Sequence, residues 1–188
     1  MPRKYITAAV IGLLALTADQ VSKVAARAVL SPMRVIDLVP GIAELRYAEN
    51  TGIAFGLFTR LPPAVKLPLF TCITLVAVFI ILHLLRQAPA LAVRLPAALG
   101  FVLAGALGNL LDRFHWPGVV DFIRIQAWPP SNYYWPTFNL ADTSISIGIA
   151  LLILDTLLTR EPESKEGEKP PPTTSAPPES PSADVPQG

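Results

Sequence analysis

Two carboxylates, each in or beside an apolar segment, are the first candidates for chemistry. Asp142 lies near the start of FNLADTSISIGIALLIL, three residues after Asn139, and Asp121 lies in PGVVDFIRI. A carboxylate deep in a bilayer costs about 2.5 to 3.5 kcal/mol, so such residues are usually functional. If the chain folds so that Asp121 meets Asp142, the pair holds one proton, because two adjacent carboxyls cannot both ionise. One could then take a proton from water while the other donates to a carbonyl oxygen, which would hydrolyse a peptide without a metal.

Other charged residues have structural alternatives. Asp19 and Lys23 are one helical turn apart, which favours an ion pair within one helix where that helix reaches the membrane interface. Asp112 could pair with its neighbour Arg113 at a helix end. Asp121 could form a surface ion pair with Arg124, three residues later. The residue types alone leave these readings open beside the catalytic one.

Two further classes of function fit the same acids. Asp112, Asp121 and Asp142 offer the oxygen ligands that Mg²⁺ prefers, as a metal-dependent enzyme acting on phospholipid head groups would need. Alternatively, acids inside a membrane relay protons in small transporters. The short chain without detectable repeats argues against the transporter. A chelator separates the metal enzyme from an aspartyl pair, whose activity would survive it.

The composition indicates that membrane helices must position these residues. Of the 188 residues, 52% are hydrophobic and 15% are charged, and the mean hydropathy is +0.47. This apolar share exceeds that of an ordinary soluble domain. The net charge of +1 gives no indication of nucleic-acid binding, and the single cysteine excludes an intramolecular disulfide. We therefore predict a mainly α-helical integral membrane protein.

Four apolar segments are long enough to cross ~30 Å of hydrocarbon, which takes about 20 residues. They cover approximately residues 5–29, 67–85, 95–111 and 138–158. Four crossings leave both ends of the domain on one side. Lysine and arginine are divided evenly between the two sides, so the loop charges do not decide the orientation.

The remaining segments complete the predicted organisation. Residues 30–65 hold VIDLV and IAELRY on either side of a Pro-Gly turn, which predicts a hairpin in a small β-rich cap outside the membrane. We expect one transmembrane domain over residues 1–160. Residues 161–188 are rich in proline and acidic side chains, which predicts a disordered tail.

Helical spacing also gathers polar and small residues on one face of the third and fourth segments. The two stripes are Gly105, Gly108, Asn109 and Asp112 on the third, and Asn139, Asp142, Thr143 and Ser146 on the fourth. Glycines let helix backbones approach, and polar groups in lipid seek protein partners. We therefore predict that these stripes face each other.

Five short blocks follow one another in a fixed order along the chain. They are DQVSK from Asp19, ENTGIAFG around Asn50, AGALGNLLDR from Ala104, GVVDFI from Gly118 and FNLADTSI from Phe138. In type and order they resemble the motifs of the lipoprotein signal peptidase family, signal peptidase II, and they span residues 19 to 145. Ala104 departs from the family pattern, which usually has a glycine there.

The resemblance implies a bacterial membrane aspartyl endopeptidase with four transmembrane helices. Both termini would be cytoplasmic, and the cap and the active site would face the outer side of the cytoplasmic (inner) membrane. The implied substrate is a diacylglyceryl-modified prolipoprotein, cut just before the lipidated cysteine. The expected partners are this substrate and membrane lipids, with no nucleic acid. We expect a monomer that uses no metal and no cofactor.

The resemblance also implies roles for particular positions. Asp121 and Asp142 match the catalytic pair, and Asp19 matches an acid associated with stability. We count Lys23 with Asp19 as a structural polar residue. The positions expected to bind substrate or support the site are Asn50, Gly105, Asn109, Arg113, Asn139 and Ala141, to which the residue analysis adds Gly52 and Asp112.

Overall fold

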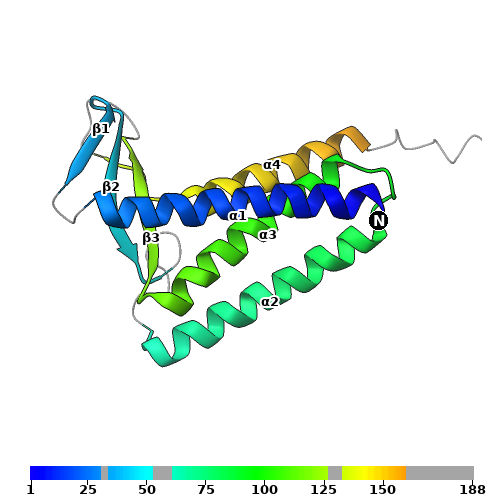
Figure 1. Cartoon of the computed structure of the whole chain (residues 1–188), viewed down its shortest axis with the longest axis horizontal. Helices are drawn as coiled ribbons and strands as arrows, with labels where there is room; N and C mark the ends of the chain where they lie inside the picture. The colour runs from blue at the N-terminus through cyan, green and yellow to red at the C-terminus, as the bar shows by residue number, and fades with distance from the viewer. Residues whose placement is uncertain (31–33, 53–60, 127–132, 160–188) are drawn as a thin grey trace, which may run out of the picture.

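Four long helices form a bundle with a three-stranded sheet at one end, as the computed structural model shows (Figure 1). It describes residues 1–30, 34–52, 61–126 and 133–159. The helices are α1 (Arg3–Val29), α2 (Pro63–Gln87), α3 (Arg94–His115) and α4 (Leu140–Thr159). All four are long and apolar enough to cross a membrane. The chain is therefore a multi-pass membrane protein, and the predicted four-helix fold class is confirmed.

The third helix is the centre of the bundle. α3 packs against α1, α2 and α4, and it carries more buried residues than the other helices. Large apolar side chains on the outside, such as Leu13, Phe79 and Ile153, are more than half exposed. In a membrane, lipid chains would cover these side chains. A central α3 is therefore the natural place for polar residues that must be kept away from lipid.

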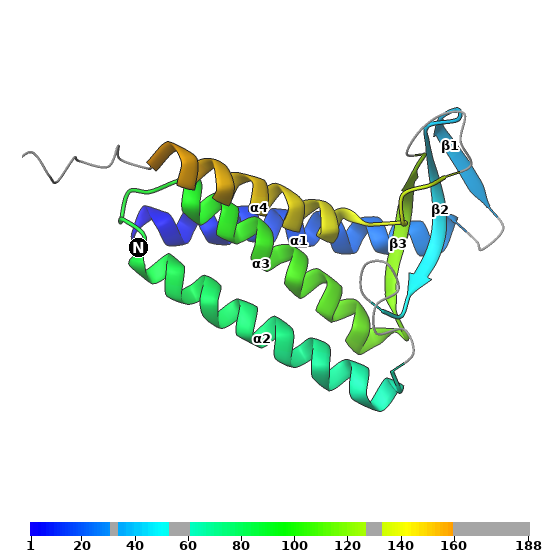
Figure 2. The ribbon, with the colours of Figure 1, turned by 180° about the vertical axis from the view of Figure 1, so that it is seen from behind.

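The helix α2 is attached to the bundle most firmly at the end that holds the N-terminus. There the buried Lys4 ammonium of α1 donates to the carbonyls of Arg86 and Ala88, at 2.6 Å each. These carbonyls lie at the end of α2, where a cation also favours the helix dipole. Toward the sheet, α2 diverges from the other helices in both views (Figures 1 and 2).

The sheet consists of antiparallel strands in the order β1 (Val35–Val39), β2 (Ala43–Asn50) and β3 (Val119–Ile125). The β1–β2 hairpin was predicted, and Gly41 adopts a φ of 73° in its turn, where glycine has no steric penalty. The strand β3 was not predicted. The segment VVDFIRI lacks a simple alternation of polar and apolar residues, and only a fold of the chain that brings Asp121 to Asp142 was considered there.

The reason for the missing alternation is that β3 is covered on both faces. Val120 and Phe122 are buried in one cluster with Ala26 and Leu30 from the end of α1. A strand buried on both faces need not alternate. β3 thus joins the sheet to the bundle and carries Asp121 to their junction.

Two helix boundaries differ from the prediction in ways that affect the site. α3 continues to His115 rather than ending near residue 111, so Asp112 and Arg113 are helical. α4 begins at Leu140 rather than 138, which leaves Asn139 just before its first turn. The predicted tail, residues 161–188, lies outside the described residues.

Candidate active site

Asn139 contacts both acids. Its side-chain Oδ1 accepts from the backbone N–H of Asp142 at 2.9 Å, and its backbone N–H donates to Asp142 Oδ2 at 3.3 Å. This reciprocal pair caps the start of α4 and satisfies backbone groups that the helix leaves free. The Asn139 Nδ2 donates in the other direction to Asp121 Oδ1, at 2.7 Å. One buried side chain therefore contacts both acids.

Asp121 is almost fully buried on β3, with 3% of its surface exposed. Its Oδ2 accepts from Asn50 Nδ2, at 3.1 Å, across the β2–β3 pairing. Burial, and then the charge of Asp142, raise the pKa of Asp121 from 3.8 to about 7, although hydrogen bonds from Asn50 and Asn139 act in the opposite direction. Near neutral pH this carboxyl is thus available both with and without its proton.

Asp142 is less buried and has a second amide partner. Its Oδ1 accepts from Asn109 Nδ2 of α3, at 2.8 Å. The Asn109 Oδ1 in turn accepts from Asn139 Nδ2, at 3.2 Å. The structure therefore brings five of the predicted site residues, from β2, α3, β3 and the start of α4, into one hydrogen-bonded group: Asn50, Asn109, Asp121, Asn139 and Asp142.

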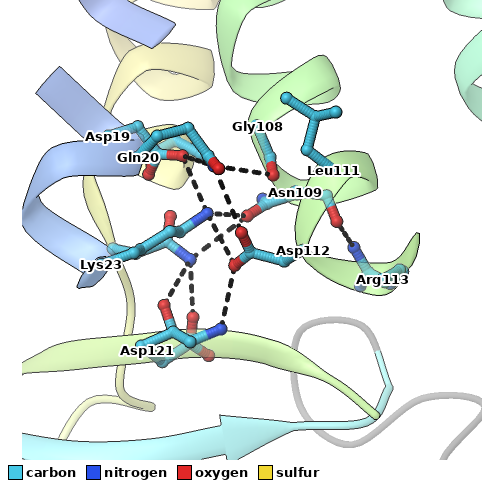
Figure 3. A network of polar contacts seen from close by, with 12 residues as sticks. Asp19, Gln20, Lys23, Gly108, Asn109, Leu111, Asp112, Arg113 and Asp121 are labelled. Atoms are coloured by element: carbon cyan, nitrogen blue, oxygen red, sulfur yellow. Dashed lines mark hydrogen bonds and ion pairs between the residues drawn. The ribbon is translucent and has the colours of Figure 1, made fainter. Parts of the chain in front are cut away.

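A network of buried charges lies directly beside this group, between α1 and α3 (Figure 3). Lys23 Nζ lies 2.9 Å from Asp19 Oδ2 and 3.1 Å from Asp112 Oδ2, and all three side chains are almost fully buried. The expected local pair of Asp19 and Lys23, one helical turn apart, is thus present, but it is buried and not confined to one helix. It is shared with α3, because a buried carboxylate such as Asp112 also requires a partner.

The alternative pairings for Asp112 and Asp121 were wrong. The carboxylate of Asp112 contacts Lys23 and accepts from the N–H of Val120, at 3.1 Å, so it does not pair with its neighbour in sequence. Arg124 instead forms an ion pair with Glu44 on β2, at 2.6 Å. Both errors arise because strand and helix packing supplied partners that are distant in sequence.

Arg113 connects α3 to the turn after β2. Its Nη2 donates to the carbonyl of Gly52 and its Nη1 to that of Asn109, at 2.8 Å each. The guanidinium stacks on Phe70 of α2, 4.3 Å from the ring centroid. Asn50 Oδ1 accepts from the N–H of Gly52, at 3.0 Å, which closes a tight turn after β2.

Small residues set the distance between α3 and α4. A Cβ on Gly105 would collide with the carbonyl of Ala141, and one on Gly108 would lie 2.5 Å from Asp19 Oδ2. The N–H of the fully buried Ala141 donates to Asp19 Oδ1, at 2.8 Å. The two predicted stripes therefore face each other, except that Ser146 is exposed and bonds only within its helix.

The sequence analysis missed Gln20. Its Nε2 donates to Asp19 Oδ2 at 3.1 Å, Asp112 Oδ1 at 3.2 Å and the carbonyl of Gly108 at 3.3 Å. Position 20 lies inside the DQVSK block, but a glutamine there has no distinctive chemistry. Only the packing of α1 on α3 identifies its role.

A cavity of about 300 Å³ lies next to Arg113 where α2 diverges from α3. Its lining combines apolar side chains with two cations and consists of Thr51, Lys66, Leu67, Phe70, Arg113, Trp116, Pro117 and Gly118. In the part of the chain that the structure describes, no three His, Cys, Asp or Glu side chains form a group suited to a metal ion. The three acids considered as Mg²⁺ ligands therefore do not converge as that alternative requires.

Comparisons with known proteins agree with this architecture. The family model described as signal peptidase (SPase) II matches residues 11–158. A lipoprotein signal peptidase of Symbiobacterium thermophilum is 36% identical over 149 residues, which are 79% of this chain and 93% of that protein. One of Moorella thermoacetica is 35% identical over 160 residues, or 85% and 97%.

A solved structure described as a bacterial membrane enzyme has the same fold. It superimposes with a TM-score of 0.71 at 27% identity and covers 85% of this chain and 94% of that one. The resemblance stated from the five blocks and the prediction of a hydrolase are thereby confirmed. The chain belongs to the signal peptidase II family of aspartic-type membrane peptidases.

Proposed function

We propose that this protein removes the signal peptide from diacylglyceryl-modified prolipoproteins by cutting before the lipidated cysteine, with Asp121 and Asp142 activating water. Family membership supports the substrate class, since the curated relatives are named lipoprotein signal peptidases. The observation that carries the mechanism is the Asn139 side chain, which contacts Asp121 with its amide nitrogen and caps Asp142 with its amide oxygen.

The reaction requires one proton shared by the two acids. Burial raises the pKa of Asp121 to about 7, so this carboxyl can carry that proton up to near neutral pH. The ionised carboxyl takes a proton from a water molecule while the water oxygen attacks the scissile carbonyl carbon. The protonated carboxyl donates its proton to the carbonyl oxygen. As the tetrahedral intermediate collapses, the carboxyl that took the water proton gives it to the amide nitrogen, and the other carboxyl takes a proton from a hydroxyl of the intermediate. The C–N bond breaks, the amine leaves, and the pair again holds one proton. The pair titrates as a unit, so we assign acid and base to the pair and not to single residues.

The surroundings of the pair suit a substrate that is itself held in the membrane. The cavity beside Arg113 has apolar walls formed by residues such as Leu67 and Phe70, and cations at Lys66 and Arg113. It opens where α2 diverges from the bundle, so an acylated peptide could enter from the lipid. Asn50 and Arg113 hold the turn at Gly52 beside the site. We propose that the enzyme acts as a monomer with membrane lipids around it.

We propose further that the enzyme lies in the bacterial inner membrane with both termini in the cytoplasm. α1 begins and α4 ends at the same end of the bundle, and the sheet lies at the other end (Figures 1 and 2). The two acids belong to that other end, because β3 carries Asp121 and the first turn of α4 carries Asp142. Exported prolipoproteins reach the outer face of the membrane, so the active site should lie on that side and both termini on the cytoplasmic side.

The test offers a purified diacylated prolipoprotein to the wild type and to Asp121→Asn and Asp142→Asn. Each substitution keeps the side-chain shape but removes a titrating group. We expect a loss of cleavage on the order of 10²- to 10⁴-fold or more. The melting temperature in detergent should show that both variants remain folded.

Two controls accompany this measurement. Asp37→Asn removes an exposed carboxylate of β1 and should retain wild-type cleavage. A chelator should leave the wild-type rate unchanged, whereas loss of activity would favour the Mg²⁺ alternative. Turnover at the wild-type rate in either dyad variant would refute the proposed mechanism.

A further inference from the structure

Lys23 makes one contact that a purely structural ion pair does not need. Its ammonium forms ion pairs with Asp19 and Asp112, but it also donates to Asn109 Oδ1, at 3.0 Å (Figure 3). Asn109 is the residue whose Nδ2 donates to Asp142, at 2.8 Å. A residue of α1 therefore reaches a reacting carboxylate through a single amide.

The partners of Asn109 determine which way its amide points. Its oxygen accepts from two donors, the Lys23 ammonium and the Asn139 Nδ2. A reversed amide would place its NH₂ group against both donors and its oxygen against Asp142. An ammonium has no acceptor capacity, so it could not adapt to that arrangement. The charged hydrogen bond from Lys23 is also the stronger of the two that hold the amide oxygen.

We propose that Lys23 is a positioning residue for the peptidase reaction: its ammonium fixes the Asn109 amide in the orientation that donates to Asp142. This inference rests on the proposed function. It extends the structural role that the sequence suggested for Lys23, because the hydrogen bond from Lys23 to Asn109 Oδ1 acts on the amide that donates to Asp142.

The two carboxylates beside Lys23 give the network its second, structural role. Asp19 Oδ1 accepts from the N–H of Ala141 in the first turn of α4, and Asp112 Oδ2 accepts from the N–H of Val120, next to the catalytic candidate on β3. Removal of the lysine would leave two buried carboxylates without their cation, which is destabilising. A useful experiment must separate this cost from an effect on Asn109.

A double-mutant cycle makes that separation. We would measure kcat and KM for a diacylated prolipoprotein with the wild type, Lys23→Met, Asn109→Ala and the double variant, each normalised to folded protein from its melting curve. We expect Lys23→Met to lower kcat about tenfold with little change in KM, within the range of couplings in one hydrogen-bond network. In the Asn109→Ala background, the same substitution should lower kcat no further. An equal loss in both backgrounds would overturn the proposal.

Further variants cover the case in which Lys23→Met does not fold. In an Asp112→Asn background, Lys23→Met leaves only Asp19 as a buried carboxylate without its cation. The kcat of this double variant is compared with that of Asp112→Asn alone. Lys23→Gln, which is also uncharged, retains an N–H donor and should recover part of the kcat that Lys23→Met loses. Equal kcat for Gln and Met at position 23 would count against the proposal. Wild-type cleavage and its loss in Asp142→Asn are independent of these results, so failure of the cycle would leave the proposed function intact.

Discussion

At the scale of single residues, the contacts of Asn139 explain its position three residues before Asp142, at the start of an apolar helix. The spacing allows the amide to cap the helix and hold the Asp142 backbone, and the unused NH₂ group then points to Asp121. The cap satisfies backbone groups that would otherwise be costly in a membrane. Helix formation and the geometry of the acid pair are thus coupled through one side chain.

The raised pKa of Asp121 predicts a pH dependence of stability. Between about pH 4 and pH 7 the folded protein keeps a proton that the unfolded chain has lost, so the free energy of unfolding falls as pH rises, by at most roughly 1.4 kcal/mol per pH unit. Above the folded pKa the loss is complete and constant. The melting temperature of the wild type in detergent should therefore decrease from about pH 5 to about pH 8.

Two variants identify the group responsible. Asp121→Asn cannot titrate, so this part of the decrease should be absent, whereas the exposed Asp37→Asn should keep it. Identical pH slopes in the wild type and Asp121→Asn would mean that another group dominates and that the Asp121 pKa is not raised.

At the scale of elements, the site depends on how closely α3 and α4 approach. Gly105 lies against the backbone of Ala141, one residue before Asp142, and Ala141 is itself fully buried against α1 through Asp19. Small residues permit this close packing between membrane helices. The distance between Asn109 on α3 and Asp142 on α4 is therefore set by glycine and alanine, not by the polar residues alone.

The glycine contacts predict a difference between two alanine substitutions. In Gly105→Ala the new methyl group collides with the Ala141 carbonyl and lies 2.6 Å from Ile145 Cγ1, so α4 must shift. We expect a loss of about 1 to 3 kcal/mol in stability. We also expect a loss of cleavage, because the shift displaces Asp142.

Gly12→Ala is the matched control on α1. Its methyl group would lie 3.4 Å from the carbonyl oxygen of Gly100, which is close to ordinary contact. Melting temperature and cleavage rate should remain near those of the wild type. If the two alanine variants behave alike, the spacing of α3 and α4 does not control the site.

At the scale of the whole molecule, the two ends of the bundle have different tasks. One end holds the N-terminus, the end of α4 and the Lys4 link to α2. The other holds the sheet, the charge network and the acid pair. Because α2 contacts the bundle mainly through α3, the region between them toward the sheet is where a membrane-bound substrate has room to approach.

This polarity predicts which residues are reached from outside the cell. In a Cys72→Ala background, Asp37→Cys places a thiol on exposed β1 and Gln87→Cys places one at the exposed end of α2. A membrane-impermeant thiol reagent should label position 37 in intact cells and position 87 only after permeabilisation. The reverse pattern would invert the proposed orientation.

The sequence by itself determined the features that depend on local pattern. Hydropathy over about 20 residues identified four membrane helices, a Pro-Gly turn identified the hairpin, and helical spacing placed Gly105 and Asn109 on the face that meets Asp142. Each of these follows from residues within about 20 positions of one another, for which hydropathy and periodicity are direct physical signals.

Apart from the Asp19–Lys23 pair, which helical spacing predicted, only the tertiary structure decided the partners of the charged residues. Lys23 reaches Asn109 and Asp112 across 86 and 89 positions in sequence, and Arg124 pairs with Glu44 on another strand. Spacing in the sequence alone would equally allow the nearer pairs, Asp112 with Arg113 and Asp121 with Arg124. The physical reason is that a buried charge requires a partner, and packing decides which partner lies within reach. The strand β3 depends on tertiary contacts in the same way, because it pairs with β2 and packs against the end of α1.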